Sequence, residues 1–256
     1  MILFASDYDG TLNRNGVSQE DIQAIHDLRS QGHLFGMATG RSLLSMRDEI
    51  TKFDFPVDFV VGNNGGAIQN RHEETLLLKM IPNEIIPSIL SHLMSYDLYL
   101  YGANDGFKVG RNSFKPKPNF KPTLTGITAD EIIQNQRVAV MFASFVNPSD
   151  ADKCVRELNE MFYGQVSCYS NNENIDIGPF GTSKKTGIDF IVDHLEIDPE
   201  IHVIGDAFND VLMIEGFGGY TVENGSDNVK KIASKVFPSV AHAIYHAMEK
   251  ENQGRY

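Results

Sequence analysis

The sequence lacks the features that would place it in a membrane or outside the cell. No apolar run approaches the about 20 residues that a membrane-spanning helix needs. The first residues have no basic stretch of the kind that begins a signal peptide, and they reach a charged residue too soon. Only two cysteines occur, Cys154 and Cys168, and they have no metal-ligand spacing. We therefore expect a cytoplasmic protein with reduced thiols.

Positive charge is also scarce. The chain has 22 lysines and arginines against 34 aspartates and glutamates, which gives a formal net charge of −12. This balance argues against a general nucleic-acid or anionic-membrane surface, although a bound metal can make one site attractive to an anion. We expect no nucleic-acid partner and no membrane partner. The 256 residues, 41% of them hydrophobic, suffice for one large domain or two modest ones, and we expect a monomer or a weak homodimer.

The first twelve residues carry the most informative pattern of the chain. The short apolar run that opens the chain at Met1 has the length of a buried strand, and Asp7, Asp9 and a Gly-Thr turn follow it. Side chains alternate along a strand, so both carboxylates should point the same way. Open α/β sheets bind ligands at the carboxyl ends of their strands, and paired carboxylates there suit a divalent cation such as Mg²⁺. An Asp-rich turn would explain Asp9 but would leave Asp7 unexplained.

Two parts of the chain alternate strands with helices. In the first part, strands are expected at 33–38 and 59–61, each preceded or followed by a helix with a serine cap. The same alternation resumes near Gly181, with a helix that Thr182 or Ser183 can cap and a strand at 202–204. Repeated strand–helix–strand units predict a doubly wound parallel sheet, which is an α/β fold.

The residues between these parts show a different pattern. Helices are expected over 83–95 and 149–162, and residues 115–122 hold prolines at a spacing that excludes a regular element. Several strands with longer connections predict an α+β insert with an antiparallel sheet. We therefore expect a discontinuous core domain, residues 1–81 and 180–256, interrupted by an α+β cap domain, residues 82–179. The insert's expected strands lie at 96–101, 138–145, 166–170 and 175–177.

Four groups of polar residues fall at the ends of expected parallel strands or at helix starts. Such positions meet at one edge of a doubly wound sheet. Taken singly, the threonine and lysine groups are more often a helix cap and a solvated surface pair. Together they match what a phosphoryl group requires, because its charge is spread over several oxygens. The groups are Asp7 with Asp9, Thr39, Lys184, and Asp206 with Asp210.

Each group has a use in phosphoryl transfer. Asp7 can attack phosphorus and form an aspartyl-phosphate, while Asp9 can protonate the leaving oxygen and then deprotonate water. Asp206 can hold Mg²⁺ together with Asp7 and the backbone carbonyl of Asp9, and Asp210 can bind or orient that shell. We predict as catalytic residues Asp7, Asp9, Thr39 and Lys184; as metal residues Asp7, Asp9, Asp206 and Asp210; and as substrate-binding residues Thr39, Gly40, Arg41, Lys184 and Asn209.

The order of these groups resembles that of the haloacid-dehalogenase (HAD) superfamily of phosphohydrolases. The first motif of that superfamily is similar to Asp-x-Asp-Gly-Thr-Leu at residues 7–12, the second to Thr39 in Ala-Thr-Gly-Arg, the third to Lys184, and the fourth to Gly-Asp-x-x-Asn-Asp at 205–210. Residues 63–67 resemble a segment of the Cof-type subfamily, and the insert lies where its type IIB cap falls. The resemblance implies a Rossmann-like core, a mobile cap, Mg²⁺ dependence and hydrolysis of small phosphomonoesters, usually sugar phosphates.

Two positions depart from the family pattern. The lysine motif usually reads Lys-Gly, but here Lys185 follows Lys184, so either lysine could enter the site. Relatives often carry Met-Gly-Asn-Ala after the last strand, whereas this chain has Glu-Asn-Gly-Ser-Asp, in which Asn224 could replace the usual asparagine. The insert also holds cationic residues that could meet a second anionic group of a substrate, although such residues are more often solvated: Lys108, Arg111, Lys115, Lys117 and Lys121.

The leading hypothesis is a Mg²⁺-dependent phosphatase that acts on a small phosphorylated metabolite. A phosphomutase would use the same aspartyl-phosphate and return the phosphoryl group to the sugar. A signalling receiver also combines an acidic cluster with threonine and lysine, but receivers are small single domains, and Asp9 would speed loss of the phosphate. A degenerate metabolite-binding module is disfavoured because no expected catalytic residue is missing.

Overall fold

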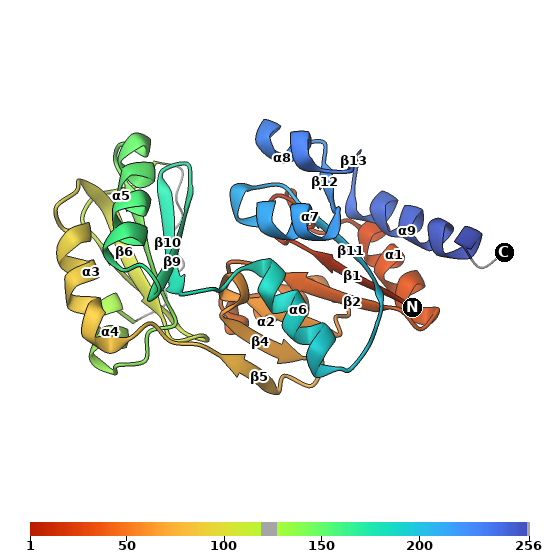
Figure 1. Cartoon of the computed structure of the whole chain (residues 1–256), viewed down its shortest axis with the longest axis horizontal. Coiled ribbons are helices and arrows are strands. Elements are labelled where there is room, and N and C mark those ends of the chain that lie inside the picture. The colour runs from red at the N-terminus through yellow and green to blue at the C-terminus, as the bar shows by residue number, and fades with distance from the viewer. Residues whose placement is uncertain (119–126, 255–256) are drawn as a thin grey trace.

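The computed structural model describes residues 1–118 and 127–254. They form two sheets with their helices, joined by two connections (Figure 1). Strands from residues 2–78 and 200–237 make the larger sheet, and strands from residues 98–179 make the smaller one. We call the two parts the core and the cap, and keep the limits 1–81 plus 180–256 and 82–179 as predictions. None of the described helices combines the length and the apolar character that crossing a membrane requires.

The larger sheet is a mixed sheet of eight strands. Its order is β13-β12-β11-β1-β2-β3-β4-β5, so β1 lies between β11 and β2 and pairs parallel with both. Only the pairs β3–β4 and β4–β5 at one edge are antiparallel, so β4 alone runs against the other strands. The strands are β1 (Ile2–Ser6), β2 (Leu34–Ala38), β3 (Phe59–Gly62), β4 (Ala67–Asn70), β5 (Thr75–Leu78), β11 (Glu200–Gly205), β12 (Tyr220–Val222) and β13 (Lys235–Phe237).

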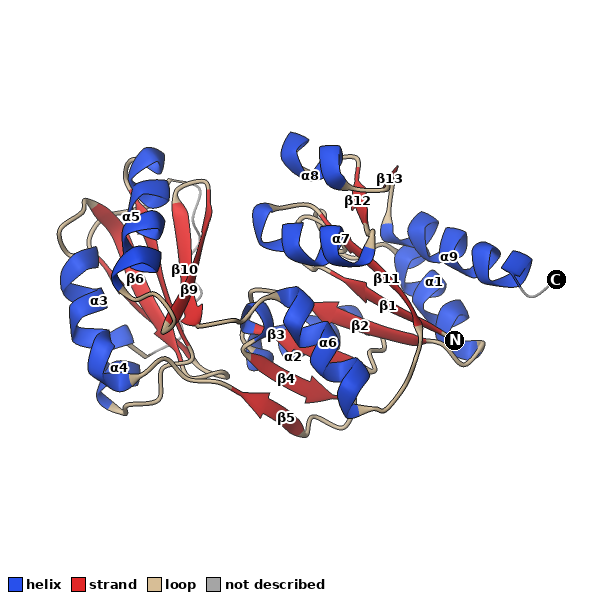
Figure 2. Cartoon of the chain, viewed as in Figure 1, coloured by secondary structure: helices blue, strands red, loops and turns tan. Residues whose placement is uncertain are grey.

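Helices cover both faces of the larger sheet (Figure 2). Ile2 and Phe4 of β1 pack into the cluster with α1, α2 and α9, while Leu3 and Ala5 pack into the cluster with α6, α7 and α8. A strand buried on both faces has no solvent side, which explains why this run is apolar throughout. The helices are α1 (Gln19–Ser30), α2 (Leu43–Phe53), α6 (Lys184–His194), α7 (Val211–Phe217), α8 (Asp227–Ile232) and α9 (Val240–Gly254).

The cap is an antiparallel sheet with helices on one side. Its strand order is β7-β6-β8-β10-β9, and α3, α4 and α5 cover one face (Figure 1). Both cysteines, Cys154 and Cys168, are buried thiols in this interior. The elements are α3 (Ile86–Leu93), β6 (Leu98–Asn104), β7 (Val109–Ser113), α4 (Ala129–Gln134), β8 (Val140–Phe145), α5 (Pro148–Met161), β9 (Val166–Asn171) and β10 (Asn174–Pro179).

The structure differs from two of the sequence-based expectations, and a third lies partly outside the described residues. The core sheet gains β4 and β5, which add two antiparallel pairings, so it is not purely parallel. The helix expected over 83–95 is divided into a 3₁₀ turn (Asn83–Ile85) and α3, with Pro87 in the first turn of α3. Proline is tolerated in a first turn because the amide there has no helical partner. Part of the expected 115–122 loop, including Lys121, lies outside the described residues.

Candidate active site

The predicted groups meet at the carboxyl edge of the core sheet. Asp7 follows β1, Thr39 follows β2, Asp206 follows β11, and Lys184 is the first residue of α6. β1 pairs with both β2 and β11, which brings their ends side by side. A cavity of about 260 Å³ opens here, lined by Asp7, Asp9, Thr39, Gly40, Arg41, Asp176, Ala207 and Asn209.

Three carboxylates and one ammonium form the floor of the site. Oxygens of Asp7, Asp206 and Asp210 lie within 4.8 Å of one another. The Lys184 Nζ lies 2.6 Å from both Asp7 Oδ1 and Asp210 Oδ1, and the lysine is 1% exposed. Burial raises the pKa of Asp7 well above its usual range, and the Lys184 ammonium opposes that rise. One ammonium cannot balance three carboxylates, two of them buried and that of Asp206 half-buried, so this donor set fits a divalent cation.

Lys184 remains charged in this setting. Burial lowers its pKa, but the carboxylates of Asp210 and Asp7 raise it by more. Its position is fixed from the backbone, because the Ser183 side chain caps α6 and accepts from the Thr186 amide at 3.1 Å. The cap predicted for this helix at Thr182 or Ser183 is therefore Ser183.

Asp210 holds the loop that presents Asp206. Its Oδ2 accepts the backbone N–H groups of Asp206 and Ala207, both at 2.9 Å, and its Oδ1 accepts from Lys184. Asp206 in turn receives the Thr11 hydroxyl at 2.8 Å, and burial raises its pKa. Both oxygens of Asp210 are thus engaged, which suits a positioning role, whereas Asp206 faces Asp7.

Gly10 allows the turn after Asp9 to pass close to Asp206. Its φ is +89°, and a Cβ there would lie 2.4 Å from Asp206 Oδ2. Gly32 has a similar φ of +82° with nothing within 4 Å of its Cβ position. We expect Gly32→Ala to cost about 1 kcal/mol for its backbone conformation alone. Gly10→Ala should cost about 1–2 kcal/mol more and displace the Asp206 carboxylate.

Urea unfolding and the activity of both variants measure this difference. If Gly10→Ala and Gly32→Ala lose the same stability and activity, the close approach of Gly10 to Asp206 has no effect of its own.

Asp9 is held by Arg41 at the mouth of the cavity. Arg41 Nε and Nη2 donate to the two Asp9 oxygens, both at 2.7 Å, and Nη1 lies 3.3 Å from Glu49 Oε1. The guanidinium also lies 4.9 Å from the centre of the Tyr8 ring. The hydrogen bonds to Asp9 raise the pKa of Arg41, which stays charged. Two parallel bonds of this kind fix the orientation of a carboxylate.

Thr39 is directed into the cavity with a hydroxyl proton to donate. Its Oγ1 accepts the Arg41 backbone N–H at 3.2 Å, and the residue is 1% exposed. An oxygen that already accepts one bond has its own hydrogen for another acceptor. Gly40 follows it in the lining of the same cavity.

Comparisons with known proteins show which family this chain is part of. The family model for haloacid dehalogenase-like hydrolases matches residues 4–248. The chain belongs to this family. A 5-amino-6-(5-phospho-D-ribitylamino)uracil phosphatase of Bacillus subtilis is 24% identical over 257 residues, covering 95% of this chain and 94% of that protein. An HMP-PP phosphatase of Yersinia pseudotuberculosis is 22% identical over 263 residues, covering 95% and 94%.

A solved structure shares the fold of this hydrolase. The structure of a HAD subclass IIB sugar phosphatase superposes with a TM-score of 0.77 at 19% identity, and the match covers 98% of this chain and 99% of that one. The Rossmann-like core, the inserted cap and membership of the HAD hydrolases, predicted from the motifs, are confirmed.

Asn64 links the core of this HAD hydrolase to its cap. Its Nδ2 donates to Asp176 Oδ2 of β10 at 3.1 Å, and its Oδ1 accepts from Asn209 Nδ2 at 3.1 Å. A second amide pair, Asn63 with Asn104 of β6, joins the two parts at 2.9 Å. Asp176 was missed from the sequence, although a lone acid between Ile175 and Ile177 in an expected strand marks a polar face.

The Asp176 carboxyl makes a pH-dependent contribution to stability. Burial raises its pKa from 3.8 to about 6. The folded state then binds this proton more tightly than the unfolded state, so the free energy of unfolding falls as pH rises from about 4 to about 6. Asp176→Asn should remove this slope. It should also raise the free energy of unfolding above pH 6 by about 1–2 kcal/mol. This value is smaller than the full pKa shift would give, because water reaches the side chain through the cavity and screens its charge.

Urea unfolding between pH 4 and pH 8 tests this prediction. Asp198→Asn, an exposed aspartate of the core, serves as the control. If the free energy of unfolding of Asp176→Asn still falls between pH 4 and pH 6, this pH dependence does not come from Asp176.

For two residues, Lys185 and Asn224, the sequence left open whether they enter the site, and both face away from this cavity. Lys185 pairs with Asp189 at 2.8 Å along α6, so Lys184 alone of the two enters the acidic cluster. Asn224 Nδ2 donates to the Gly10 carbonyl at 2.7 Å and lines a different cavity, between Asp206 and the cap residue Ser170. Its side chain therefore supports the turn that carries Asp9.

Proposed function

We propose that this HAD hydrolase is a Mg²⁺-dependent phosphatase of small phosphorylated metabolites that works through an aspartyl-phosphate on Asp7. The main observation behind the proposal is that three carboxylates and one ammonium lie together. Oxygens of Asp7, Asp206 and Asp210 are within 4.8 Å of one another, and Lys184 contacts two of these residues. The cavity beside them is also lined by Asp9 and Thr39. Relatives named as phosphatases that cover more than nine-tenths of the chain support it.

The nucleophile in this proposal is the Asp7 carboxylate. It attacks phosphorus, the ester bond to the leaving oxygen breaks, and the phosphoryl group passes to an Asp7 oxygen. Lys184 holds Asp7 in place through its 2.6 Å contact and offsets part of the repulsion between the carboxylate and the anionic substrate. Thr39 and the Gly40 N–H donate to phosphoryl oxygens, which carry the transition-state charge.

Asp9 handles the protons. It protonates the leaving oxygen as the ester breaks, and then takes a proton from the water that attacks the aspartyl-phosphate. Arg41 orients the Asp9 carboxylate through its two 2.7 Å bonds for the second step, in which Asp9 takes a proton from water. In the first step, one of these bonds opens so that the released oxygen can carry the proton. This positioning role is our proposal for Arg41, in place of direct contact with the phosphate. Asn209 lines the same cavity and is held by Asn64.

The residues present also fit the metal. Asp7 and Asp206 would hold Mg²⁺ with the Asp9 backbone carbonyl, and Asp210 would orient Asp206 through its bonds to the loop amides. When bound, Mg²⁺ supplies the positive charge that screens the carboxylates from the incoming phosphate.

Phosphate release tests the proposed function. We expect p-nitrophenyl phosphate and members of a sugar-phosphate panel to be hydrolysed in the presence of Mg²⁺, with one phosphate released for each ester consumed. A phosphomutase would instead convert a sugar phosphate to its isomer without net phosphate release. Absence of turnover across the panel at pH 5–9 would contradict the proposal.

A further inference from the structure

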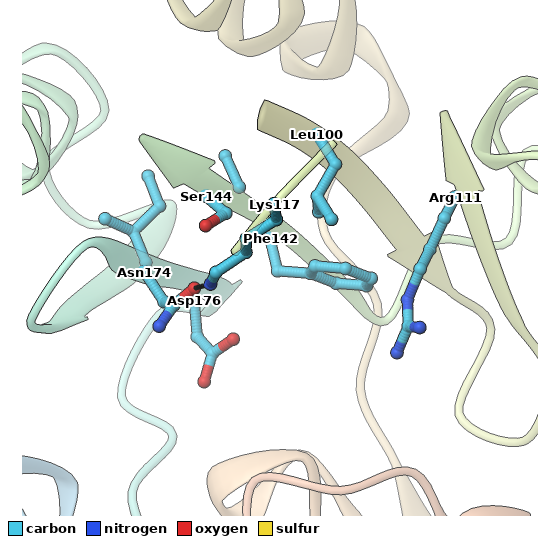
Figure 3. Close-up of a pocket in the computed structure, with 9 residues that line it drawn as sticks. Leu100, Arg111, Lys117, Phe142, Ser144, Asn174 and Asp176 are labelled. Carbon is cyan, nitrogen blue, oxygen red and sulfur yellow. Dashed lines mark hydrogen bonds between the residues drawn. The ribbon is translucent and has the colours of Figure 1, made fainter. Parts of the chain in front are cut away.

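The cap contains a cavity of its own on the sheet face opposite its helices. Its volume is about 230 Å³, and its lining includes Arg111, Lys117, Phe142, Ser144 and Asp176. Figure 3 shows Arg111 at one end of the lining, Asp176 at the other, and the Phe142 ring between them. The charged lining residues are thus two cations and one carboxyl.

Strand register places these residues in one row across the sheet. Arg111 of β7 lies opposite Gly102 of β6, Gly102 lies opposite Phe142 of β8, and Phe142 lies opposite Asp176 of β10. A Cβ at Gly102 would lie 2.0 Å from the Phe142 ring, so glycine is what lets the ring lie across β6. The ring centre is 5.8 Å from the Arg111 guanidinium carbon. The backbones of Arg111 and Asp176 are three strand spacings apart, which is about 14 Å measured across the strands.

This cavity lies next to the catalytic cavity. Asp176 lines both of them, and through Asn64 it is tied to Asn209 at the catalytic side. A phosphate ester with its phosphoryl group at Asp7 would therefore extend its leaving group past Asp176 and over Phe142. The far end of such a leaving group would meet Arg111.

The polar lining is equipped to bind an anion. Burial in this lining lowers the pKa of Arg111, because the protein interior solvates the cation less well than water does. Ser144 is 2% exposed, and its hydroxyl has no hydrogen-bond partner within the described residues. A buried hydroxyl of this kind gains a bond when a ligand oxygen arrives. Lys117 Nζ lies 2.8 Å from Asn174 Oδ1 and 3.0 Å from Glu173 Oε1, at the edge of the same lining.

We propose that the cap cavity binds a second anionic group, a carboxylate or a phosphate, on the leaving group of the substrate, with Arg111 and Ser144 as its contacts. Phe142 packs against the carbon skeleton, and Asp176 accepts a hydroxyl nearer the ester. Arg111 is the specificity-determining residue in this arrangement. The inference rests on the proposed phosphatase function and names the class of its substrate.

Matched substrates separate this inference from the function on which it rests. Glucose 6-phosphate is compared with 6-phosphogluconate for a carboxylate, and fructose 6-phosphate with fructose 1,6-bisphosphate for a phosphate. The wild-type enzyme should show a kcat/KM at least about 10-fold higher for the member of one pair that carries the second anionic group, as a charged hydrogen bond would give. Turnover of p-nitrophenyl phosphate, which has no second anion, reports the phosphatase function by itself.

Arg111→Met should lower the ratio of the two kcat/KM values by about 10- to 100-fold, because it removes the charge and retains the length of the side chain. Arg137→Met, at an exposed arginine of the cap, should keep the wild-type ratio. Ser144→Ala should lower the ratio by about 3- to 10-fold and carries the test if Arg111→Met does not fold. Equal kcat/KM values within both substrate pairs would overturn the inference, and so would a ratio that stays unchanged in both Arg111→Met and Ser144→Ala. If p-nitrophenyl phosphate is still hydrolysed in that case, the proposed phosphatase function is unaffected.

Discussion

Asp7→Asn should reduce phosphate release by about 10⁴-fold or more, the scale on which loss of a nucleophile acts. An amide is nearly the same size as a carboxylate but is a poor nucleophile, and it cannot accept a phosphoryl group in the same way. The variant should fold, because it removes the charge of one of three crowded carboxylates and its amide oxygen can still accept from Lys184. Steady-state release of phosphate from p-nitrophenyl phosphate measures the loss.

Asp48→Asn makes the same chemical change at an exposed site of α2 and should retain wild-type activity. Thermal unfolding of Asp7→Asn at a Tm no lower than that of the wild type would exclude misfolding as the cause of the loss. An Asp7→Asn protein that keeps more than a few per cent of the wild-type rate would remove Asp7 from the role of nucleophile.

Removal of divalent metal should lower activity by about 10³-fold, since a metal ion supplies several kcal/mol of charge stabilisation in such a site. Dialysis against EDTA followed by assay measures this loss, and added Mg²⁺ should restore the rate. Without a cation the site holds three carboxylates and a single ammonium, so binding should also stabilise the fold. At 100 times its Kd, Mg²⁺ should add about 2.7 kcal/mol and raise Tm by about 5–10 °C.

The shift in Tm tests the site independently of turnover. Asp206→Asn should lose most of the shift, because one of the proposed ligands becomes neutral, while Asp198→Asn on the exposed surface should keep it. Full activity after EDTA treatment, together with no response of Tm to Mg²⁺, would contradict the metal assignment.

Much of the core could be predicted from its sequence, for a physical reason. β1 is buried on both faces, so it reads as an uninterrupted apolar run, and Asp7 marks where it ends. The hairpin of β4 and β5 carries no such signal. Its strands have four residues each, and β5 is partly exposed along its length, so neither a long apolar run nor a strict alternation is present. Pairing with β3, a tertiary effect, places them in the sheet.

The site could be predicted where reactive residue types fall at strand ends, as at Asp7, Thr39 and Asp206, or at a helix start, as at Lys184. What no local pattern shows is which side chains meet across the two parts. Asp176 reaches the catalytic cavity only because β10 faces the core, and Arg111 and Phe142 join it through the register of four strands. The pairing of Asp9 with Arg41 likewise depends on the adjacency of β1 and β2. These contacts depend on topology and register.

The central claim is that Asp7 itself becomes phosphorylated, and chemical trapping tests it most directly. With p-nitrophenyl phosphate, whose leaving group needs no proton, Asp9→Asn should form the aspartyl-phosphate and hydrolyse it slowly, because the base that activates water is gone. The protein is mixed with substrate and Mg²⁺, quenched, and reduced with borohydride, which converts an acyl phosphate to an alcohol with loss of phosphate. Peptide mass spectrometry should then find the reduced side chain at position 7. Phosphate release with no modification at Asp7, or with the modification on another carboxylate, would contradict the claim.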